Sequence, residues 1–453
     1  MGFSKDKLVK GGGMSKQFEP LAGIVTTDLA AITRGRFIQA YKFDDLKSRG
    51  VGWIPSNLSL TAFNRLASRN IWLSSGDLRL IPDEKARFTT SKTGTETTFD
   101  MIMGDLTEID GSPWVACPRF FLKQAISALY QATGLKLKVA FEQEFYVFET
   151  GKAPAHSLSF SGLRQLDPFA SQLVAALSDA NIEPEVVLAE LGFGQLEISI
   201  SPDDPLYAAD KAIAVREITR ELVRNYGWEC SFAPKPLADQ AGNGVHIHFS
   251  LTDADGRSCS YDENGTAKMS AGMAAFCAGI LAHLPAILAL TAPSVSSYIR
   301  LKPYNWSSSY TWLAEQDREA SLRVCPVLKL PGLNVREQLN VEYRACDATA
   351  NPYLALAMLI YSGLDGITNK LKLPILTDKN PEEMSQSERD HHQLKRLPET
   401  LEKALDALKT DPIALGWLPE PLRETFFAVK EYEIERVAHL DQEDIAALYR
   451  KLY

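Results

Sequence analysis

The fold class of this chain is decided by the stretch Val245-His246-Ile247-His248-Phe249-Ser250-Leu251. Apolar and polar residues alternate in it, and successive side chains of a strand point to opposite faces of a sheet. One face therefore carries valine, isoleucine, phenylalanine and leucine, which suit a core. The other face carries two histidines and a serine. The pattern predicts a strand with one buried face and one face available for chemistry.

Three other stretches repeat this alternation with acidic residues. Their polar faces carry Glu142 and Glu144; Gln195, Glu197 and Ser199; and Asn340, Glu342 and Arg344. A single alternating strand also fits a solvated outer face. Solvated faces usually mix lysine, threonine and serine, however, whereas here glutamate and histidine recur. We therefore expect the four polar faces to meet in one site.

Metal ions are expected at that site. Glu190, seven residues before Glu197, adds a fifth carboxylate, and clustered carboxylates repel one another unless cations neutralise them. Oxygen-rich sites with an occasional imidazole suit Mg²⁺ or Mn²⁺, whereas zinc would require more cysteine and histidine.

A second group of side chains is cationic, and it consists of Arg300, Arg318, Arg323 and Arg344. Arginine forks bind carboxylates and phosphates at two points. Carboxylate-held metals beside several arginines indicate phosphoryl transfer from a nucleotide. The sequence has neither a GxxxxGK[ST] loop nor a GxGxxG fingerprint, so other devices must hold the nucleotide.

Length and composition limit the number of domains and the kinds of partner that the protein can have. A chain of 453 residues suggests two or three domains. The net charge of -9 and the lack of a lysine and arginine run argue against a nucleic-acid partner. The nearly apolar segment 271–293 approaches the length of a membrane span, but His283 and Pro285 interrupt it. We expect a buried helix pair there and no membrane partner.

The N-terminus and the cysteines favour a cytoplasmic protein. Residues 1–17 lack the apolar region of a secretory signal, and we expect a flexible leader there. The six cysteines are scattered and form no CxxC pair, which is typical of reduced thiols.

The order of predicted elements indicates an α+β protein. Short strands and turns fill the first ~115 residues, including a hairpin in which 101–106 and 114–116 flank Asp110-Gly111-Ser112. A helix is expected from Pro118 to Leu135, followed by strands alternating with helices and a helical tail over 397–452. A small β-rich domain therefore precedes a large α+β domain.

The motifs, in this order, resemble those of the glutamine synthetase superfamily. The resemblance rests on Phe141-Glu-Gln-Glu-Phe145, Glu190-Leu-Gly-Phe-Gly-Gln-Leu-Glu197, Gly242-Asn-Gly-Val-His-Ile-His-Phe-Ser250, Asp317-Arg-Glu-Ala-Ser-Leu-Arg323, and Val341-Glu-Tyr-Arg344 with Ala350-Asn-Pro-Tyr353. It implies a small N-terminal β-grasp domain over 18–117. It also implies a catalytic domain over 118–453 with a curved antiparallel sheet flanked by helices. Members assemble as dodecamers of two stacked hexamers, with active sites shared between subunits.

The resemblance also implies a reaction. ATP phosphorylates the γ-carboxylate of glutamate, and an amine then displaces phosphate from the γ-glutamyl phosphate. Carried over by position, the resemblance implies that Glu144, Glu190 and Glu197 hold one metal and that Glu142, His246 and Glu342 hold a second. It implies that Arg300, Arg344 and the backbone at Gly242 bind glutamate, and that Arg318 and Arg323 contact the transferring phosphate. His248 and Ser250 are expected to lie against the nucleotide.

Two departures from the family pattern bear on the amine. Ammonia-using glutamine synthetases carry an acid that helps to hold ammonium, and Trp306 occupies its place when counted from Arg300. The loop that supplies a second acid resembles 55–59 here, Pro-Ser-Asn-Leu-Ser, which has none. An organic amine needs apolar and aromatic contacts instead of an acidic cage. We therefore expect a small organic amine as substrate, and the chain looks closer to γ-glutamyl-amine and polyamine ligases.

Several alternatives stay open at this stage. An ammonia-using glutamine synthetase and a non-catalytic relative both remain, although a scaffold gains nothing from clustered buried carboxylates. Trp306 also fits a packing role, and Tyr310 and Trp312 fit either an amine pocket or the core. Asn340 stands where the family often has an arginine that contacts nucleotide phosphate, and Lys329 or Arg336 is a candidate replacement.

Overall fold

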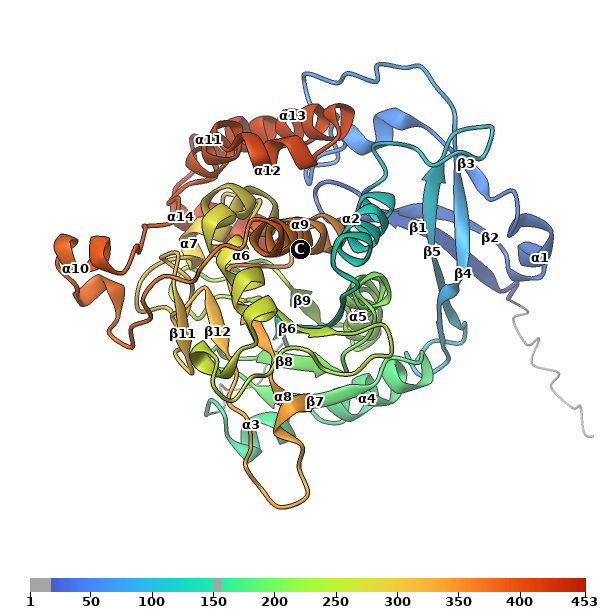
Figure 1. Cartoon of the computed structure of the whole chain (residues 1–453). Helices are drawn as coiled ribbons and strands as arrows, with labels where there is room; N and C mark the ends of the chain where they lie inside the picture. Colours follow the sequence, from blue (N-terminus) through green and yellow to red (C-terminus); the bar gives the residue numbers. More distant parts are fainter. Residues whose placement is uncertain (1–17, 150–155) are drawn as a thin grey trace, which may run out of the picture.

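Two sheets organise the protein, and most of the helices surround the second, larger one (Figure 1). The structure, a computed structural model, describes residues 18–149 and 156–453. The expected leader, residues 1–17, lies outside the described residues.

The first sheet forms the small N-terminal part of the molecule, as the sequence predicts. Its strand order is β2-β1-β5-β4-β3, with β1 and β5 parallel at its centre. The strands are β1 Leu21–Thr27, β2 Thr33–Gln39, β3 Val51–Trp53, β4 Leu78–Thr90 and β5 Phe99–Thr107. The short helix α1 Phe43–Leu46 follows β2.

The predicted hairpin after β5 is only half correct. The Asp110–Ser112 turn forms, because the Glu108 backbone N–H donates to the Ser112 carbonyl at 2.8 Å. Residues 114–116 do not continue as a strand. Instead the Cys117 N–H donates to the Trp114 carbonyl at 3.0 Å, and this turn leads directly into the next helix.

The second sheet carries the four alternating stretches. Its order is β11-β12-β13-β10-β6-β8-β7, with β9 on β6, and its pairs are antiparallel except β11 with β12. The strands are β6 Lys136–Phe148, β7 Pro184–Ala189, β8 Gln195–Ile200, β9 Glu229–Ser231, β10 Val245–Thr252, β11 Leu313–Glu315, β12 Leu322–Val324 and β13 Val341–Tyr343. The apolar sides of these strands are buried in the main core.

The remaining helices all follow the first sheet in the chain, and several of them pack on the core side of the second sheet. They are α2 Pro118–Thr133, α3 Phe160–Gln165, α4 Phe169–Asp179, α5 Pro205–Asn225, α6 Ala271–Thr291, α7 Ser297–Arg300, α8 Val335–Gln338, α9 Pro352–Thr368, α10 Gln386–His391, α11 Leu401–Thr410, α12 Pro412–Trp417, α13 Glu420–Val437 and α14 Gln442–Leu452. The expected helix pair at 271–293 is wrong, because α6 is one helix that contains Pro285. It packs against α9 and α11 and is largely buried, as a core helix rather than a membrane span.

A buried arginine joins the first sheet to helix α5. Arg119, in the first turn of α2, is 1% exposed and donates to Asp83 of β4, Asp105 of β5 and Asp210 of α5. The distances to these carboxylates lie between 2.8 and 3.0 Å. The Tyr353 hydroxyl donates to Asp210 at 2.6 Å. The junction therefore depends on one guanidinium that pairs with three acids, of which Asp105 also pairs with Lys123.

Replacing Arg119 by alanine is expected to lower the free energy of unfolding by about 3–5 kcal/mol, because it leaves Asp210 buried without its cation. Denaturant unfolding at fixed protein concentration measures the effect. Arg257→Ala is the matched control, since Arg257 is exposed and pairs only with exposed Asp255 among the described residues. Equal midpoints for the two variants would contradict the assigned role of Arg119.

Candidate active site

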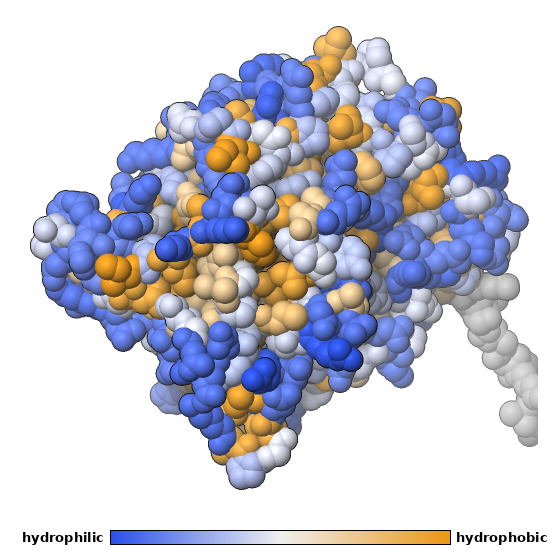
Figure 2. Space-filling model, viewed as in Figure 1, coloured by the Kyte–Doolittle hydropathy of each residue, from blue (hydrophilic) through white to orange (hydrophobic). Residues whose placement is uncertain are grey.

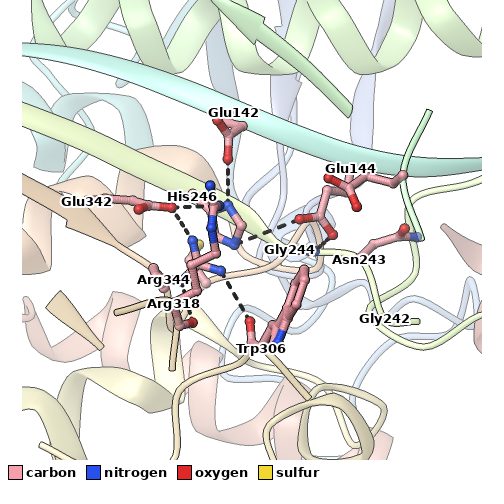
Figure 3. A network of polar contacts seen from close by, with 12 residues as sticks. Glu142, Glu144, Gly242, Asn243, Gly244, His246, Trp306, Arg318, Glu342 and Arg344 are labelled. Carbon is pink, nitrogen blue, oxygen red and sulfur yellow. Dashed lines mark hydrogen bonds and ion pairs between the residues drawn. The ribbon is translucent and has the colours of Figure 1, made fainter. Parts of the chain in front are cut away.

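The strand register brings the predicted acids together on one face of the second sheet (Figure 3). His246 pairs with Glu142 across β10 and β6, Glu144 pairs with Glu197 across β6 and β8, and His248 pairs with Glu342 across β10 and β13. Paired residues on neighbouring strands project to the same side. Four polar faces that are far apart in the sequence thus form one continuous surface.

His246 lies at the centre of this surface and is buried. Its Nδ1 atom lies 2.7 Å from Glu142 Oε1 and 3.4 Å from Glu342 Oε1, and its Nε2 atom lies 3.9 Å from Glu144 Oε1. Glu190 follows the last residue of β7 and lines the same cavity as these groups.

The acids of the site differ in the direction in which their pKa values are shifted. Burial and the neighbouring Glu142, Glu144, Glu190 and Glu342 raise the pKa of Glu197 to about 9. Burial likewise raises the pKa of Glu190, and Glu144 adds to the effect. Burial also opposes ionisation of Glu342, but the charges of His246, Arg344 and His248 overcome it and lower its pKa. Negative charge is therefore in excess on the Glu190 and Glu197 side.

These residues fit divalent cations. One set of ligand atoms, from Glu142, Glu197 and His246, lies within 4.8 Å of one another, and so does a set from Glu142, His248 and Glu342. The Nε2 atoms of His246 and His248 are buried without a hydrogen-bond partner among the described residues. Buried polar atoms normally have partners, and Mg²⁺ or Mn²⁺ accepts carboxylate oxygens and imidazole nitrogens.

The metal-binding strength is expected to rise with pH. Without metal, Glu197 keeps its proton up to about pH 9, and a ligand must lose its proton to bind a cation. We expect the apparent affinity for Mn²⁺ to increase by up to about tenfold per pH unit between pH 6 and 9, with proton release. Calorimetric titration in buffers of different ionisation enthalpy measures both quantities. An affinity independent of pH would contradict the raised pKa.

The four arginines differ in what they contact. Arg323 and Arg344 both donate to the Glu342 carboxylate, Arg323 at 2.7 Å. Arg300 is buried and donates to the backbone carbonyls of Cys346 and Arg344. Arg318 is exposed and lines the cavity, and its guanidinium makes no hydrogen bond or ion pair with the other described residues. Arg318 is thus the arginine most available to an incoming anion.

The backbone between 242 and 244 comes unusually close to Arg300. A Cβ atom on Gly242 would lie 2.8 Å from Arg300 Cγ, and one on Gly244 would lie 2.6 Å from both Arg300 Nη2 and His246 Nε2. Only glycine permits this approach. The Gly244 N–H donates to Glu144 at 2.8 Å, so the turn is tied to the acidic face.

These groups surround a cavity of about 400 Å³. Its lining contains Glu142, Glu144, Glu190, Glu197, Gly242, His246, Trp306 and the four arginines. Trp306 is 53% exposed, so it is not a core residue, and Figure 3 shows its indole extending toward the Gly242–Gly244 segment. Tyr310 and Trp312 are core residues instead, buried with Ala320, Met384 and Leu394.

His248 and Ser250 line a second cavity of about 540 Å³. Glu142 lines both cavities, which therefore adjoin at this residue. The His248 Nδ1 atom lies 2.9 Å from the Asn340 side-chain oxygen, and the lining includes neither Lys329 nor Arg336. The segment 325–340 forms one wall of this cavity and carries the exposed Leu328, Leu330 and Leu333. This segment projects at the bottom of Figure 1, and the surface at the same place in Figure 2 is apolar.

Three supporting residues were not singled out from the sequence. The Gln195 side chain donates to the Gly242 carbonyl at 2.9 Å and to Asn243 at 3.0 Å. The Asn243 amide in turn donates to the carbonyls of Ser231 and Ala233. The third, Glu319, accepts two backbone hydrogen bonds from the loop that carries Trp306. Gln195 stands on the polar face of its strand, and that position was the available signal.

Comparison with known proteins identifies the class. Residues 115–447 match the glutamine synthetase catalytic domain, and residues 14–114 match the glutamine synthetase N-terminal domain. Gamma-glutamylpolyamine synthetase GlnA3 of Streptomyces coelicolor is 32% identical over 436 residues, 94% of this chain and 92% of that protein. Glutamine synthetase of Thermus thermophilus is 33% identical over 334 residues, 72% of this chain and 73% of that protein. The chain belongs to the glutamine synthetase family and is a ligase.

Solved structures agree with this assignment. A crystal structure described as a novel glutamine synthase homolog superposes with a TM-score of 0.88 at 38% identity and covers 96% of this chain and 99% of that one. The ADP complex of GmaS superposes with a TM-score of 0.79 at 22% identity, covering 93% and 94%, and shows the shared fold. The family uses ATP and a divalent metal.

Proposed function

We propose that this protein joins the γ-carboxyl group of L-glutamate to a small organic amine, with ATP as the phosphoryl donor. The observation that carries the proposal is the pair of cavities that meet at Glu142. One is lined by His248 and Ser250 and accommodates the nucleotide. The other is lined by the four arginines together with Glu144, Glu190 and Glu197, and it accommodates glutamate and the amine.

In this arrangement each residue has a defined task. Glu144, Glu190 and Glu197 hold one metal, and Glu142, His246 and Glu342 hold the other. The cations, Mg²⁺ or Mn²⁺, supply charge compensation for the phosphates. Arg300, Arg344 and the backbone at Gly242 hold glutamate, and Arg318 and Arg323 stabilise negative charge on the group in transfer.

The reaction then proceeds in two steps. A γ-carboxylate oxygen of glutamate attacks the terminal phosphorus of ATP, which forms γ-glutamyl phosphate and releases ADP. The amine nitrogen attacks the γ-carbonyl carbon, the carbon–oxygen bond breaks, and phosphate leaves with the bonding electron pair while the nitrogen loses a proton.

The lining of the cavity that contains the four arginines supports an organic amine over ammonium. Leu158, Leu188, Leu191 and Trp306 line it, and Leu158 and Leu191 are exposed. Apolar side chains bind the carbon skeleton of an amine but offer nothing to ammonium. GlnA3, by its name, makes γ-glutamylpolyamines, and that relative also supports an organic amine here.

The test measures phosphate release and the mass of the product in the presence of ATP, glutamate and Mg²⁺ or Mn²⁺. The nitrogen donors to be compared are ammonia, alkylamines, aromatic amines and polyamines. A γ-glutamyl amide formed from one organic amine, with little turnover of ammonia, supports the proposal. Turnover of ammonia alone would assign an ammonia-using glutamine synthetase. Bound ATP without turnover of any nitrogen donor would assign a non-catalytic relative.

We further propose a cytoplasmic homo-dodecamer of two stacked hexamers, with active sites shared between subunits. The family resemblance supports it, because such members complete each site with the N-terminal domain of a neighbouring subunit. Light scattering gives the mass of the particle, and negative-stain microscopy tests for stacked six-fold rings.

A further inference from the structure

The loop that follows α7 carries Trp306 to the wall of the cavity of about 400 Å³, and its backbone is unusual. Tyr304 and Trp306 have φ angles of 61° and 51°. Residues other than glycine rarely adopt this left-handed conformation, and they keep it only where surrounding contacts determine it. The base of the loop is closed by the Ser307 hydroxyl, whose oxygen lies 2.9 Å from the carbonyl oxygens of both Arg300 and Lys302 and whose single hydrogen is shared between them. The tip needs a separate anchor.

Glu319 provides that anchor. The Trp306 N–H donates to Glu319 Oε1 at 2.6 Å, and the Tyr304 N–H donates to Glu319 Oε2 at 3.0 Å. Each carboxylate oxygen thus accepts the N–H of one left-handed residue. Glu319 is itself held, because its own N–H donates to Asp317 Oδ1 at 2.8 Å. Hydrogen bonds to a charged acceptor are stronger than neutral ones.

Arg344 also binds this loop, at the carbonyl oxygen of Trp306. Its Nη2 atom donates to the Trp306 carbonyl at 3.2 Å, and its Nε atom donates to the Arg318 carbonyl at 3.0 Å. Arg344 also donates to Glu342. A closed series of contacts therefore links the acidic face, the Trp306 peptide and the segment 317–319.

We propose that Glu319 is the positioning residue that sets the loop tip and thereby the amine end of the active site. The proposal rests on the function assigned above, because Asn305 and Trp306 of this loop line the proposed substrate cavity. Glu319 does not line that cavity, so it acts through the loop and not through direct contact with a substrate.

A carboxylate is required at this position for a geometric reason. Two backbone N–H donors need two acceptor oxygens, and glutamine offers only one oxygen together with an NH₂ group that would face a donor. Alanine offers none. We therefore expect a graded series in which Glu319→Gln releases one loop residue and Glu319→Ala releases both.

The kinetic test measures KM for each substrate and kcat for Glu319→Ala, Glu319→Gln and Glu315→Ala. Glu315 is an exposed acid at the end of β11 and serves as the matched control. For Glu319→Ala we expect KM for the nitrogen donor to rise by about tenfold or more, the effect of losing two charge-assisted hydrogen bonds. KM for ATP should stay within about twofold, Glu319→Gln should be intermediate, and the control should match the wild type.

Tryptophan fluorescence provides a readout that needs no turnover. The chain has 7 tryptophans, so the Trp306 signal is taken as the difference between each protein and its Trp306→Phe derivative. Acrylamide quenching of this signal should increase in Glu319→Ala and, less strongly, in Glu319→Gln. Unchanged quenching in both variants, or an unchanged KM for the nitrogen donor, overturns the proposal. If the wild-type protein is inactive with every nitrogen donor, the assigned function is refuted instead. The quenching experiment then tests by itself whether Glu319 anchors the loop.

Discussion

Glu197→Gln is expected to lower kcat/KM by about a hundred- to a thousandfold, the loss seen when one group that stabilises a transition state is removed. The amide keeps the shape of the side chain but cannot supply the anionic oxygen that a cation needs at this face. Phosphate release at saturating Mn²⁺ measures the loss, and Mn²⁺ titration measures the weaker binding that should accompany it.

The same substitution is expected to stabilise the metal-free protein at alkaline pH. The pKa of Glu197 rises from 4.5 to about 9 on folding. Between these values the folded state retains a proton that the unfolded state has lost, so the wild-type stability falls as pH rises, by at most about 1.4 kcal/mol per unit. Glutamine mimics the protonated acid and removes this fall.

Unfolding curves in EDTA at pH 6 to 9 measure this opposite effect on stability. Glu315→Gln, which removes an exposed acid, should follow the wild-type pH dependence. Parallel curves for wild type and Glu197→Gln would show that the acids are not in mutual repulsion.

Trp306→Glu is expected to shift the preferred nitrogen donor toward ammonia. The substitution removes an aromatic surface from the cavity and adds an acid where related ammonia-using enzymes are expected to have one. We expect KM for the organic amine to rise by about tenfold or more, since a well-placed aromatic contact and its buried area contribute at least about 1.4 kcal/mol. Ammonia-dependent phosphate release should increase in the same protein.

Tyr304→Glu is the control, because Tyr304 is an exposed aromatic residue of the same loop that does not line the cavity. It adds the same charge without changing the wall, so the order of nitrogen donors should not change. A Trp306→Glu protein that keeps the wild-type donor order would mean that other residues select the amine.

The sequence predicted the sheet best where burial on one face forces strict alternation. The stretches that contain Glu142, Glu197, His246 and Glu342 became neighbouring strands, and a one-residue slip in their register would turn their polar residues toward the core and expose their apolar residues. The helix at α6 was less predictable. Pro285 suggested a break, but helices on both sides of a proline remain continuous when packing outweighs the lost hydrogen bond.

The sequence could not predict contacts that depend on loop geometry. Nothing in the pattern around Glu319 indicates that its carboxylate meets the N–H groups of Tyr304 and Trp306, because left-handed non-glycine residues have no sequence signature. Tyr310 and Trp312 stand close to Trp306 in the sequence, and only the course of the chain decides that they enter a core while Trp306 faces the cavity.

The dispersed origin of the acidic face has a consequence for biosynthesis. Its ligands lie between residues 142 and 342, and β13, which brings Glu342, is the last strand of the chain. A ribosome must therefore release most of the polypeptide before a complete pair of cation sites exists. Partial chains offer only isolated carboxylates, which bind divalent ions weakly, so metal acquisition should follow the completion of the sheet and serve as a marker of maturation.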